Sequence, residues 1–276
     1  MKKIATLGPR GTFSEFAVRE YMKKVNSDVE VRLYPTMTKV IKSAEENECD
    51  IAILPIENTL DGFVQINLDL LNKTNLSIVN ELIVPIQFGF AANSEMKNVE
   101  RIYVQFKTQG QCSEFLENND RLKIVTTESN GESLEKLKEG ISNEGAIIPT
   151  FVLHKVDNFK YHIDDVTDSH DNETRFLVLS KEKFKCDSKS KYKTGIIISD
   201  ADADKPGTLW RVLNEFAVRK INLTSIISRP TKQELGQYYF FIEVEGCYFK
   251  DEKLIEAVEE IKNNSVVKVV GTYFMI

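Results

Sequence analysis

Two short segments place polar side chains with chemical potential directly against apolar runs. In DNETRFLVL, the hydroxyl of Thr174 and the permanent cation of Arg175 stand where an apolar strand begins, although such a strand needs neither group. In LPIENTLDGFV, Glu57 and Asn58 follow the predicted strand Ile51–Leu54. Open α/β sheets bind ligands at the carboxyl ends of their strands, so Glu57 and Asn58 are candidates for substrate contact. In a chain with a formal charge of -6, an arginine at a cleft would be a fixed partner for a carboxylate.

A third segment, LGPRGTFSEFA, has the composition of an anion-binding turn. Gly8, Pro9 and Gly11 lie between a predicted strand and a predicted helix whose first turn contains Thr12 and Ser14. Free backbone N–H groups at the start of a helix, assisted by hydroxyl groups, bind anions. The segment is therefore a candidate anion site.

Each segment also has a structural interpretation. The glycine turn could be a plain strand-to-helix connection with an N-cap. Asn58 and Thr59 could cap a helix that we expect to begin near Asp61. Arg175 could form a weak surface salt bridge with an acidic neighbour in its own segment. Spacing alone leaves these alternatives open.

Composition narrows the class of protein. The chain has 276 residues, which suits two domains, and its 42% hydrophobic and 28% charged content is that of a soluble globular protein. The acidic balance argues against nucleic acid as a partner. No apolar run approaches the ~20 residues of a membrane-spanning helix, so no membrane partner is expected. The start, MKKIATLGPRG, lacks the pattern of a signal peptide, and we expect a cytoplasmic protein.

The cysteines and histidines give no indication of a metal centre. The three histidines, His154, His162 and His170, are spaced eight apart, outside any metal-binding pattern. We therefore expect no metal and no cofactor. In a reducing compartment, free thiols are expected at all four cysteines, which are Cys49, Cys112, Cys186 and Cys247.

The first 180 residues alternate short apolar runs with segments of helical periodicity. This alternation predicts βαβ units and mainly parallel sheets. The long apolar stretch Leu76–Ala92, broken by Pro85, reads as two strand pieces that pass from one lobe to another. Residues 1–80 with 160–180 would then form one lobe and 81–159 a second, with a ligand cleft between them. The other predicted strands are Ile4–Leu7, Val29–Tyr34, Ile102–Val104, Leu122–Val125 and Ala146–Ile148.

A lysine-rich segment separates this part from the last 83 residues. Residues 181–193, KEKFKCDSKSKYK, carry six lysines and no sustained apolar pattern, which favours a solvated linker over a nucleic-acid patch. Residues 194–276 then follow the order βαββαβ of a ferredoxin-like domain. Its predicted elements are Thr194–Ser199, Pro206–Arg219, Asn222–Arg229, Gln237–Glu245, Lys250–Asn263 and Val266–Phe274.

Five motifs, in order along essentially the whole chain, resemble the prephenate dehydratase family with its C-terminal ACT regulatory domain. They are GPRGTFS at 8–14, PIENTLDGFV at 55–64, NETRF at 172–176, KPGTL at 205–209 and NLTSIISRP at 222–230. The resemblance implies a two-lobed, periplasmic-binding-protein-like α/β catalytic domain over 1–180, followed by an ACT domain. The monofunctional bacterial type is expected, because the chain starts directly in the first strand. The resemblance also implies a homodimer or homotetramer formed through the ACT domains, with L-phenylalanine bound at their interfaces.

Three segments depart from the family pattern. Residues 104–112 read VQFKTQGQC where the family commonly has Ser-His-Pro-Gln-Ala-x-x-Gln-Cys. Ser129, Asn130 and Gly131 replace a Ser-Thr-Ala segment, and Ile227 replaces the glutamate of Glu-Ser-Arg-Pro. The first two departures concern substrate contacts from the second lobe, and the third concerns effector control.

The activity that the resemblance implies is the decarboxylating dehydration of prephenate to phenylpyruvate in L-phenylalanine biosynthesis. Aromatisation drives this reaction, so no cofactor is needed. We expect Thr174 to hydrogen-bond the departing hydroxyl, and Arg175 to orient that group or anchor a carboxylate. Glu57 either supplies the proton or stays ionised and holds Arg175, and Asn58 completes the catalytic set.

The remaining expected contacts fall into two sets. The substrate-binding set is Thr12, Phe13, Ser14, Thr59, Ser129, Asn130 and Phe176. The effector-binding set is Pro206, Gly207, Leu209, Asn222, Leu223 and Ser228. Arogenate is an alternative substrate, a catalytically silent amino-acid sensor is an alternative function, and a transport-type binding protein would need an export signal.

Overall fold

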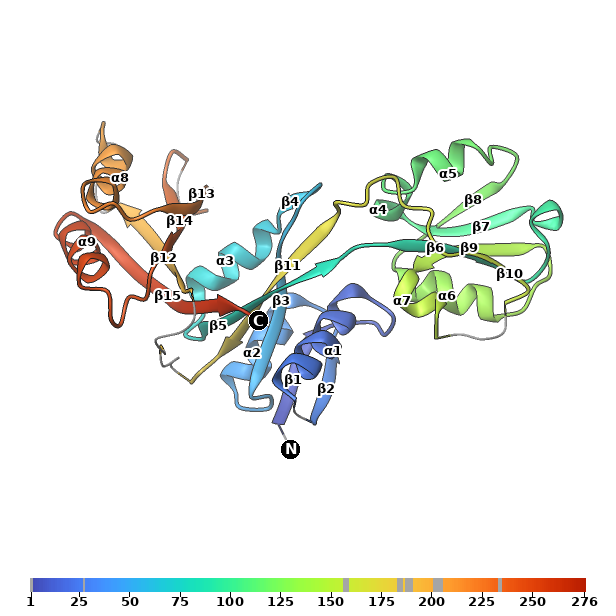
Figure 1. The fold of residues 1–276 in the computed structure, drawn as a ribbon, viewed down its shortest axis with the longest axis horizontal. Coiled ribbons are helices and arrows are strands. Elements are labelled where there is room, and N and C mark those ends of the chain that lie inside the picture. The colour runs from blue at the N-terminus through green and yellow to red at the C-terminus, as the bar shows by residue number, and fades with distance from the viewer. Residues whose placement is uncertain are drawn as a thin grey trace.

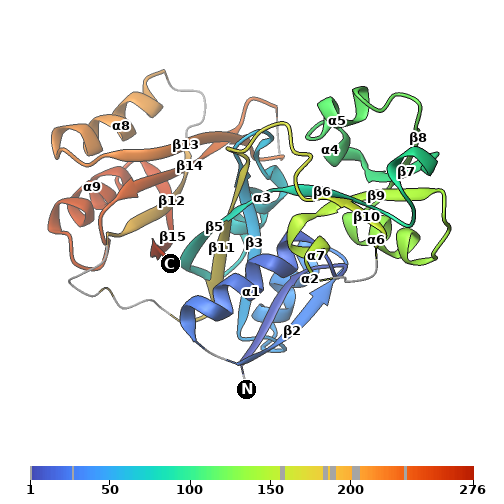
Figure 2. The same ribbon diagram turned by 45° about the vertical axis from the view of Figure 1, so that its right-hand side comes forward.

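The computed structural model describes residues 2–26, 28–155, 159–182, 186, 191–200, 206–232 and 235–276. These residues form three parts in a row: the C-terminal domain, the first lobe and the second lobe (Figure 1). The first lobe stays between the other two after a turn of the molecule (Figure 2). Both the second lobe and the C-terminal domain can therefore contact the first lobe.

A mixed sheet forms the first lobe. Its strands β2, β1 and β3 are parallel, as predicted, whereas β11 runs antiparallel to both of its neighbours, β3 and β5, so the expectation of mainly parallel pairing fails there. The reason is that the chain leaves for the second lobe along β5 and returns along β11. The elements are β1 (Lys2–Leu7), α1 (Phe13–Val25), β2 (Val29–Tyr34), α2 (Met37–Glu45), β3 (Ile51–Asn58), β4 (Gly62–Phe63), α3 (Gln65–Lys73), β5 (Ser77–Pro85) and β11 (Glu173–Ser180).

The helix expected near Asp61 is not there. Strand β3 continues to Asn58 and turns back as the short strand β4, and the next helix begins only at Gln65. Asn58 caps this turn, because its side-chain oxygen accepts the backbone N–H groups of the second and third residues that follow. Gly62, with φ of 72°, supplies the left-handed residue that the turn requires. The hairpin keeps Glu57 and Asn58 in strand geometry.

The second lobe is built on a five-stranded sheet of order β10-β6-β9-β7-β8. The two strand pieces predicted within Leu76–Ala92 are confirmed as β5 and β6. Strand β10 pairs with β6, so the chain returns to the first lobe after Ile163, later than expected. The elements are β6 (Phe88–Ala92), η1 (Met96–Asn98), β7 (Arg101–Gln105), α4 (Phe106–Gln109), α5 (Ser113–Glu117), β8 (Lys123–Thr127), α6 (Asn130–Lys138), β9 (Glu144–Pro149), α7 (Thr150–Leu153) and β10 (Tyr161–Ile163).

The C-terminal domain has the predicted βαββαβ order, and its sheet is continuous with that of the first lobe. Strand β15 pairs in parallel with β5, which joins the two sheets into one. A Cβ at Gly271 would lie 2.3 Å from the carbonyl oxygen of Ile78, so only glycine permits this close approach of the two backbones. The elements are β12 (Lys193–Asp200), α8 (Thr208–Val218), β13 (Leu223–Pro230), β14 (Tyr238–Glu245), α9 (Glu252–Lys262) and β15 (Ser265–Met275).

The cysteines differ from the expectation of four free thiols. Cys186 and Cys247 form a disulfide, whereas Cys49 and Cys112 are free and buried. Cys186 lies within the predicted linker 181–193, of which residues 181–182, 186 and 191–193 are described. The disulfide therefore attaches this segment to the C-terminal domain.

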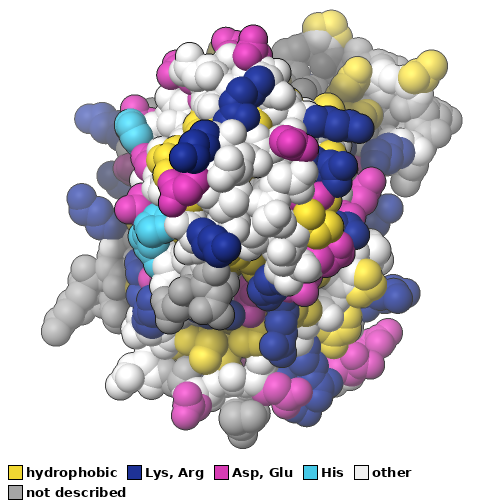
Figure 3. Space-filling view, turned by 90° about the vertical axis from the view of Figure 1, so that its right-hand side faces the viewer, with side chains coloured by type: hydrophobic (Ala, Val, Ile, Leu, Met, Phe, Trp, Pro, Cys, Tyr) yellow, Lys and Arg dark blue, Asp and Glu magenta, His cyan; other side chains and the backbone are white. Residues whose placement is uncertain are grey.

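The surface gives no indication of a membrane or metal site in the described part of the chain. None of its helices is long and apolar enough to cross a membrane. Within the same residues, no group of three or more His, Cys, Asp or Glu side chains could hold a metal ion. On the face in Figure 3, basic and acidic side chains are interspersed over the second lobe. The described residues on that face form no continuous basic surface.

Candidate active site

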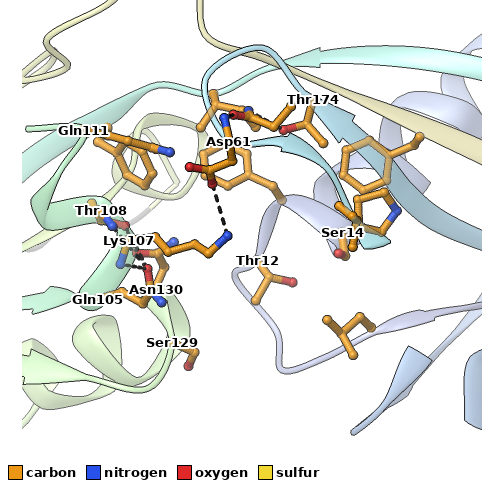
Figure 4. A pocket seen from close by; sticks show the side chains of 18 of the residues that line it. Thr12, Ser14, Asp61, Gln105, Lys107, Thr108, Gln111, Ser129, Asn130 and Thr174 are labelled. Carbon is orange, nitrogen blue, oxygen red and sulfur yellow. Dashed lines mark hydrogen bonds and ion pairs between the residues drawn. The ribbon is translucent and has the colours of Figure 1, made fainter. Parts of the chain in front are cut away.

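A cleft of about 580 Å³ lies between the two lobes. The first lobe contributes the turn before α1, the ends of β3 and β11, and the β4 hairpin, while the second lobe contributes α4 and the start of α6 (Figure 4). The lining includes polar and apolar side chains from both lobes. Outside the predicted set, its polar residues are Asp61, Gln65, Gln105, Lys107, Thr108, Gln111 and Glu128.

Thr174 lines the cleft on β11, beside Asn58 of β3. The Asn58 side-chain amide donates to Thr174 Oγ1 at 3.0 Å and to Asn172 Oδ1 at 2.7 Å. At its other end, Asn58 Oδ1 accepts the N–H groups of Leu60 and Asp61 at 3.0 and 2.9 Å. These partners fix the amide. Because Thr174 Oγ1 already accepts a hydrogen bond, its own proton is available to a group in the cleft.

Arg175 and Glu57 do not line the cleft. Successive side chains of a strand point to opposite faces of the sheet, so Arg175 points away from the face of Thr174, and Glu57 away from that of Asn58. The two are register partners, and Arg175 Nη2 lies 3.0 Å from Glu57 Oε2. Both side chains therefore lie outside the lining of the cleft. It matches the alternative in which Glu57 holds Arg175.

Arg175 is buried in a cluster of charges between the first lobe and the C-terminal domain. Its side chain is 11% exposed and contacts Glu81 of β5 at 3.0 Å and both oxygens of Glu243 of β14 at 2.6 and 2.7 Å. Tyr273 of β15 donates a hydrogen bond to Glu243. Burial opposes the charge of Arg175, but the hydrogen bonds to Glu243 raise its pKa above the ordinary value. Burial alone would raise the pKa of Glu243, and the hydrogen bond from Arg175 lowers it.

The first turns of two helices line the cleft from opposite lobes. Thr12 caps α1 and Ser129 caps α6, each by accepting the backbone N–H three residues later, at 3.5 and 3.1 Å. Ser14 and Asn130 line the cleft beside these caps, and Thr108 donates to Asn130 Oδ1 at 3.0 Å. Helix N-termini attract negative charge, so the cleft suits a ligand with more than one carboxylate.

The two lobes touch beside these helix starts. A Cβ at Gly131 would lie 2.5 Å from the carbonyl oxygen of Arg10 and 3.2 Å from Pro9 Cγ. Alanine, the residue that the family commonly has here, would require the lobes to shift. Glycine at this position therefore permits the contact between the lobes that this structure shows.

An apolar surface covers part of the cleft. Phe13 and Phe88 meet edge to face with ring centroids 5.3 Å apart, and the nearby Phe176 is fully buried. Thr59, also predicted to bind substrate, lies outside the lining. Its hydroxyl instead accepts the N–H of Glu173 at 3.0 Å, which ties the turn after β3 to β11.

Lys107 is the cleft residue that the sequence analysis missed. It is the only lysine or arginine among the described residues that line the cleft. Its Nζ reaches across from the second lobe to Asp61 Oδ2 of the first, at 3.1 Å (Figure 4). Gln105 positions it, because Gln105 Oε1 caps α4 by accepting the N–H groups of Lys107 and Thr108. The signal was present: Lys107 lies in the divergent segment, at a position where the family has an uncharged residue.

The predicted effector residues lie at two ends of the C-terminal sheet. Gly207, with φ of 86°, is the N-cap of α8 at the end where β12 stops and Ser228 lies. Asn222 is at the other end, where its carbonyl accepts the N–H of Glu245 at 2.9 Å. One chain therefore does not bring Asn222 and Leu223 together with Pro206, Gly207 and Leu209.

The fold and the cleft define a two-lobed, ligand-binding α/β protein that carries a βαββαβ domain on its sheet. Comparison with known proteins identifies the family within this class. The family model described as "Prephenate dehydratase" matches residues 4–184, and the one described as "ACT domain" matches residues 196–263. The chain belongs to the prephenate dehydratase family, whose enzymes are decarboxylating dehydratases and hence lyases.

Relatives and solved structures agree over the whole chain. The prephenate dehydratase of Lactococcus lactis subsp. cremoris is 31% identical over 98% of this chain and 97% of its own. A structure of prephenate dehydratase from Arthrobacter aurescens in complex with L-Phe has a TM-score of 0.86 and 28% identity, covering 99% of this chain and 90% of that one. The prephenate dehydratase from Staphylococcus aureus has a TM-score of 0.82 and 26% identity, covering 99% and 100%. The predicted fold class, a two-lobed α/β catalytic domain followed by an ACT domain, is confirmed.

Proposed function

We propose that the cleft between the lobes converts prephenate to phenylpyruvate, as a step in L-phenylalanine biosynthesis. The observation that carries this proposal is the environment of Thr174. Its oxygen is held by Asn58, and its proton is free to serve a group in the cleft. A threonine that only filled space would need neither arrangement.

The reaction sets clear requirements for such a site. Prephenate carries two carboxylates and a ring hydroxyl. The C–C bond to the ring carboxylate breaks, its electron pair enters the ring, and the C–O bond releases hydroxide. The products are phenylpyruvate, CO₂ and, after uptake of one proton, water. Because aromatisation drives the reaction, the protein has to orient the substrate and stabilise the departing hydroxide.

Thr174 is the group that we assign to the departing hydroxide. It donates a hydrogen bond to the leaving oxygen, and Asn58 holds it in the orientation that permits this. Glu57 is paired with Arg175 behind the sheet, so the proton that completes water comes from solvent in the open cleft. Arg175 then acts on the chemistry only through its effect on the position of β11.

The substrate carboxylates have other partners than Arg175. Lys107 supplies the cation, and a substrate carboxylate replaces Asp61 as its partner. The first turns of α1 and α6, with Thr12, Ser14, Ser129 and Asn130, provide N–H and hydroxyl donors. Phe13 and Phe176 offer an apolar surface that disfavours a hydrated ring carboxylate and so assists its loss as CO₂.

Regulation by L-phenylalanine through paired ACT domains belongs to the same proposal. The complex of the Arthrobacter aurescens enzyme with L-Phe supports it. The separation of Gly207 from Asn222 also supports it, because a site that uses both would need two chains. The edge strand β13 exposes Ile226, and α8 exposes Trp210, so this domain has apolar surface for a homodimer or homotetramer to cover. Calorimetric titration of L-phenylalanine into wild type and Gly207→Val tests this: heat with wild type alone supports it, and none with wild type at millimolar ligand refutes it.

We propose the same domain limits and the same cellular location that the sequence predicts. The catalytic domain would occupy 1–180, the linker 181–193 and the ACT domain 194–276. A cytoplasmic location rests on the sequence alone. The Cys186–Cys247 disulfide counts against it, because disulfides are rare in reducing compartments.

The direct test is turnover of prephenate by the purified protein. Formation of phenylpyruvate, followed by its absorbance in alkali, supports the proposal. Arogenate, offered in parallel, should give less phenylalanine than prephenate gives phenylpyruvate. Binding of prephenate without turnover would indicate a sensor, and a preference for arogenate would identify an arogenate dehydratase.

A further inference from the structure

We propose that Glu243 of the ACT domain is a positioning residue for the active site. It holds the side chain of Arg175 and thereby fixes the backbone of β11 at Thr174, the preceding residue. This inference rests on the proposed function for its kinetic consequences. Its structural part stands on the contacts alone. No motif in the sequence connects Glu243, near the carboxyl end of β14, with the catalytic segment.

The contact between Glu243 and Arg175 is a buried, two-point ion pair. Nη1 lies 2.6 Å from Oε1, and Nη2 lies 2.7 Å from Oε2. The side chain of Glu243 is 1% exposed and that of Arg175 is 11% exposed. Tyr273 of β15, which is separated from β14 by β12 in the same sheet, donates a further hydrogen bond to Glu243 Oε1. A forked pair with its remaining sites occupied restricts both partners in distance and in angle.

The position of Arg175 in β11 lets its contact with Glu243 affect the residues that line the cleft. Arg175 stands between Thr174 and Phe176, which both line the cleft, and the register with β3 shifts at the Arg175–Phe176 step. An irregular strand is less fixed by its ladder than a regular one. The guanidinium therefore fixes the pleat of β11 at the place where the catalytic hydroxyl has to point into the cleft.

The three carboxylates around Arg175 come from different parts of the molecule. Glu57 lies on β3 and Glu81 on β5, both within the first lobe, whereas Glu243 belongs to the ACT domain. Lys193 of β12 in turn contacts Glu81 at 2.7 Å. A displacement of the ACT domain would change the contacts of Arg175 with Glu243 first, because those with Glu57 and Glu81 stay within one lobe.

Other contacts between the domains provide a comparison. Arg229 pairs with Asp69 of α3 and donates to Gln65, which lines the cleft. Lys268 of β15 donates to the carbonyls of Leu71 and Asn72, at the opposite end of α3 and away from the cleft. Lys268 thus joins the same two domains without touching a residue that lines the cleft. Its replacement is the matched control.

The test compares Glu243→Gln with Lys268→Gln, together with the milder Tyr273→Phe. In steady-state assays with prephenate, Glu243→Gln should lower kcat about tenfold with KM within about twofold of wild type, because the reacting groups are displaced while the carboxylate partners remain. Tyr273→Phe should act in the same direction with a smaller effect. Lys268→Gln should leave kcat unchanged. The double variant Glu243→Gln with Arg175→Gln should be no slower than Arg175→Gln alone, because both act through one contact.

Hydrogen exchange of the β11 amides gives a readout that does not depend on activity. Exchange over residues 173–177 should be faster in Glu243→Gln than in wild type, and unchanged in Lys268→Gln. Wild-type kcat in Glu243→Gln with unchanged exchange would overturn the inference. An inactive wild type would refute the proposed function, and the exchange data would still decide whether Glu243 positions β11.

Discussion

The two faces of the β3–β11 strand pair have opposite chemistry. On the cleft face, Asn58 and Thr174 form a hydrogen bond between neutral groups that leaves a hydroxyl proton for a ligand. On the other face, the partly exposed Glu57 and the buried Arg175 belong to a cluster in which each charge has a partner. The four residues are two pairs of sequence neighbours, separated only by the alternation of the strands.

This difference indicates a division of tasks. The charged residues are not part of the cleft lining, and the contact of Arg175 with Glu243 holds the first lobe against the ACT domain. The cleft face has few fixed charges of its own, and the cation for a carboxylate comes from Lys107 in the other lobe. One face should therefore respond to substitution mainly in chemistry, and the other mainly in stability and in the position of β11.

Substitution on the cleft face should have the largest effect on turnover. Thr174→Ala should reduce kcat by about 10²-fold or more, the scale of a positioned proton-handling group, while thermal unfolding stays close to wild type. Thr174→Ser keeps the hydroxyl and should retain a substantial part of the activity. Rates and unfolding are measured on the same samples. Activity of the alanine variant within a few-fold of wild type would remove Thr174 from the mechanism.

Substitution on the charged face should affect stability and turnover together. Arg175→Lys keeps the charge but loses the fork that meets both oxygens of Glu243. We expect a loss of about 2–3 kcal/mol in the free energy of unfolding, somewhat below the cost of removing one partner of a buried ion pair. Turnover should fall about tenfold through displacement of Thr174. Chemical denaturation and steady-state kinetics measure the two effects. If the lysine variant matches wild type in both stability and turnover, the forked guanidinium is not needed.

The cation of the opposite lobe should act on substrate binding. Lys107→Met should raise KM for prephenate about tenfold, the scale of one charge-assisted hydrogen bond, with a smaller change in kcat. Lys136→Met, which removes an exposed lysine of the same lobe outside the cleft, is the control and should leave KM unchanged. Asp61→Asn should lower KM slightly, because it frees Lys107. Equal KM values for the two lysine variants would assign the carboxylate to another group.

The smallest effect concerns the second ion pair between the domains. Partial burial would raise the pKa of Asp69, but hydrogen bonds from Arg229, Lys232 and Tyr239 lower it to about 2. A depressed carboxyl pKa contributes stability above its unfolded value near 4, and this contribution is lost as the pH falls towards 2. Wild type should therefore exceed Asp69→Asn in free energy of unfolding by on the order of 1 kcal/mol at pH 6, and the difference should shrink between pH 4 and pH 2. Denaturation of both proteins across this range checks it, and a constant difference would contradict the assignment.

The sequence predicted the strands and helices well because their patterns are local. The motif residues Thr12, Ser14, Asn58 and Thr174 do line one cleft. The partners of Arg175 could not be identified from the sequence, because a charge at a strand end gives the same pattern whether its partner is a ligand or a distant carboxylate. Strand alternation alone places Arg175 on the face opposite Thr174, but Glu81 and Glu243 could not be foreseen as its partners, since they are 94 and 68 residues away.

Several other features depended on tertiary structure. A hairpin at β4 stands where a helix was expected, because Asn58 caps a turn there. In the sequence, an asparagine that caps a turn looks the same as one that caps a helix. Lys107 was overlooked because its segment departs from the family pattern, although its charge marked it as a candidate. The Cys186–Cys247 pairing spans 61 residues and has no local signature.

The most direct test of the division between the two faces is a crystal structure with phenylpyruvate, the product, bound. The product keeps the side-chain carboxylate of prephenate. We predict that this carboxylate lies within hydrogen-bonding distance of Lys107 Nζ or of the first turns of α1 and α6, with the ring against Phe13 and Phe176. Arg175 should still be paired with Glu243. A carboxylate bound to the guanidinium of Arg175, with Glu243 displaced, would contradict the account.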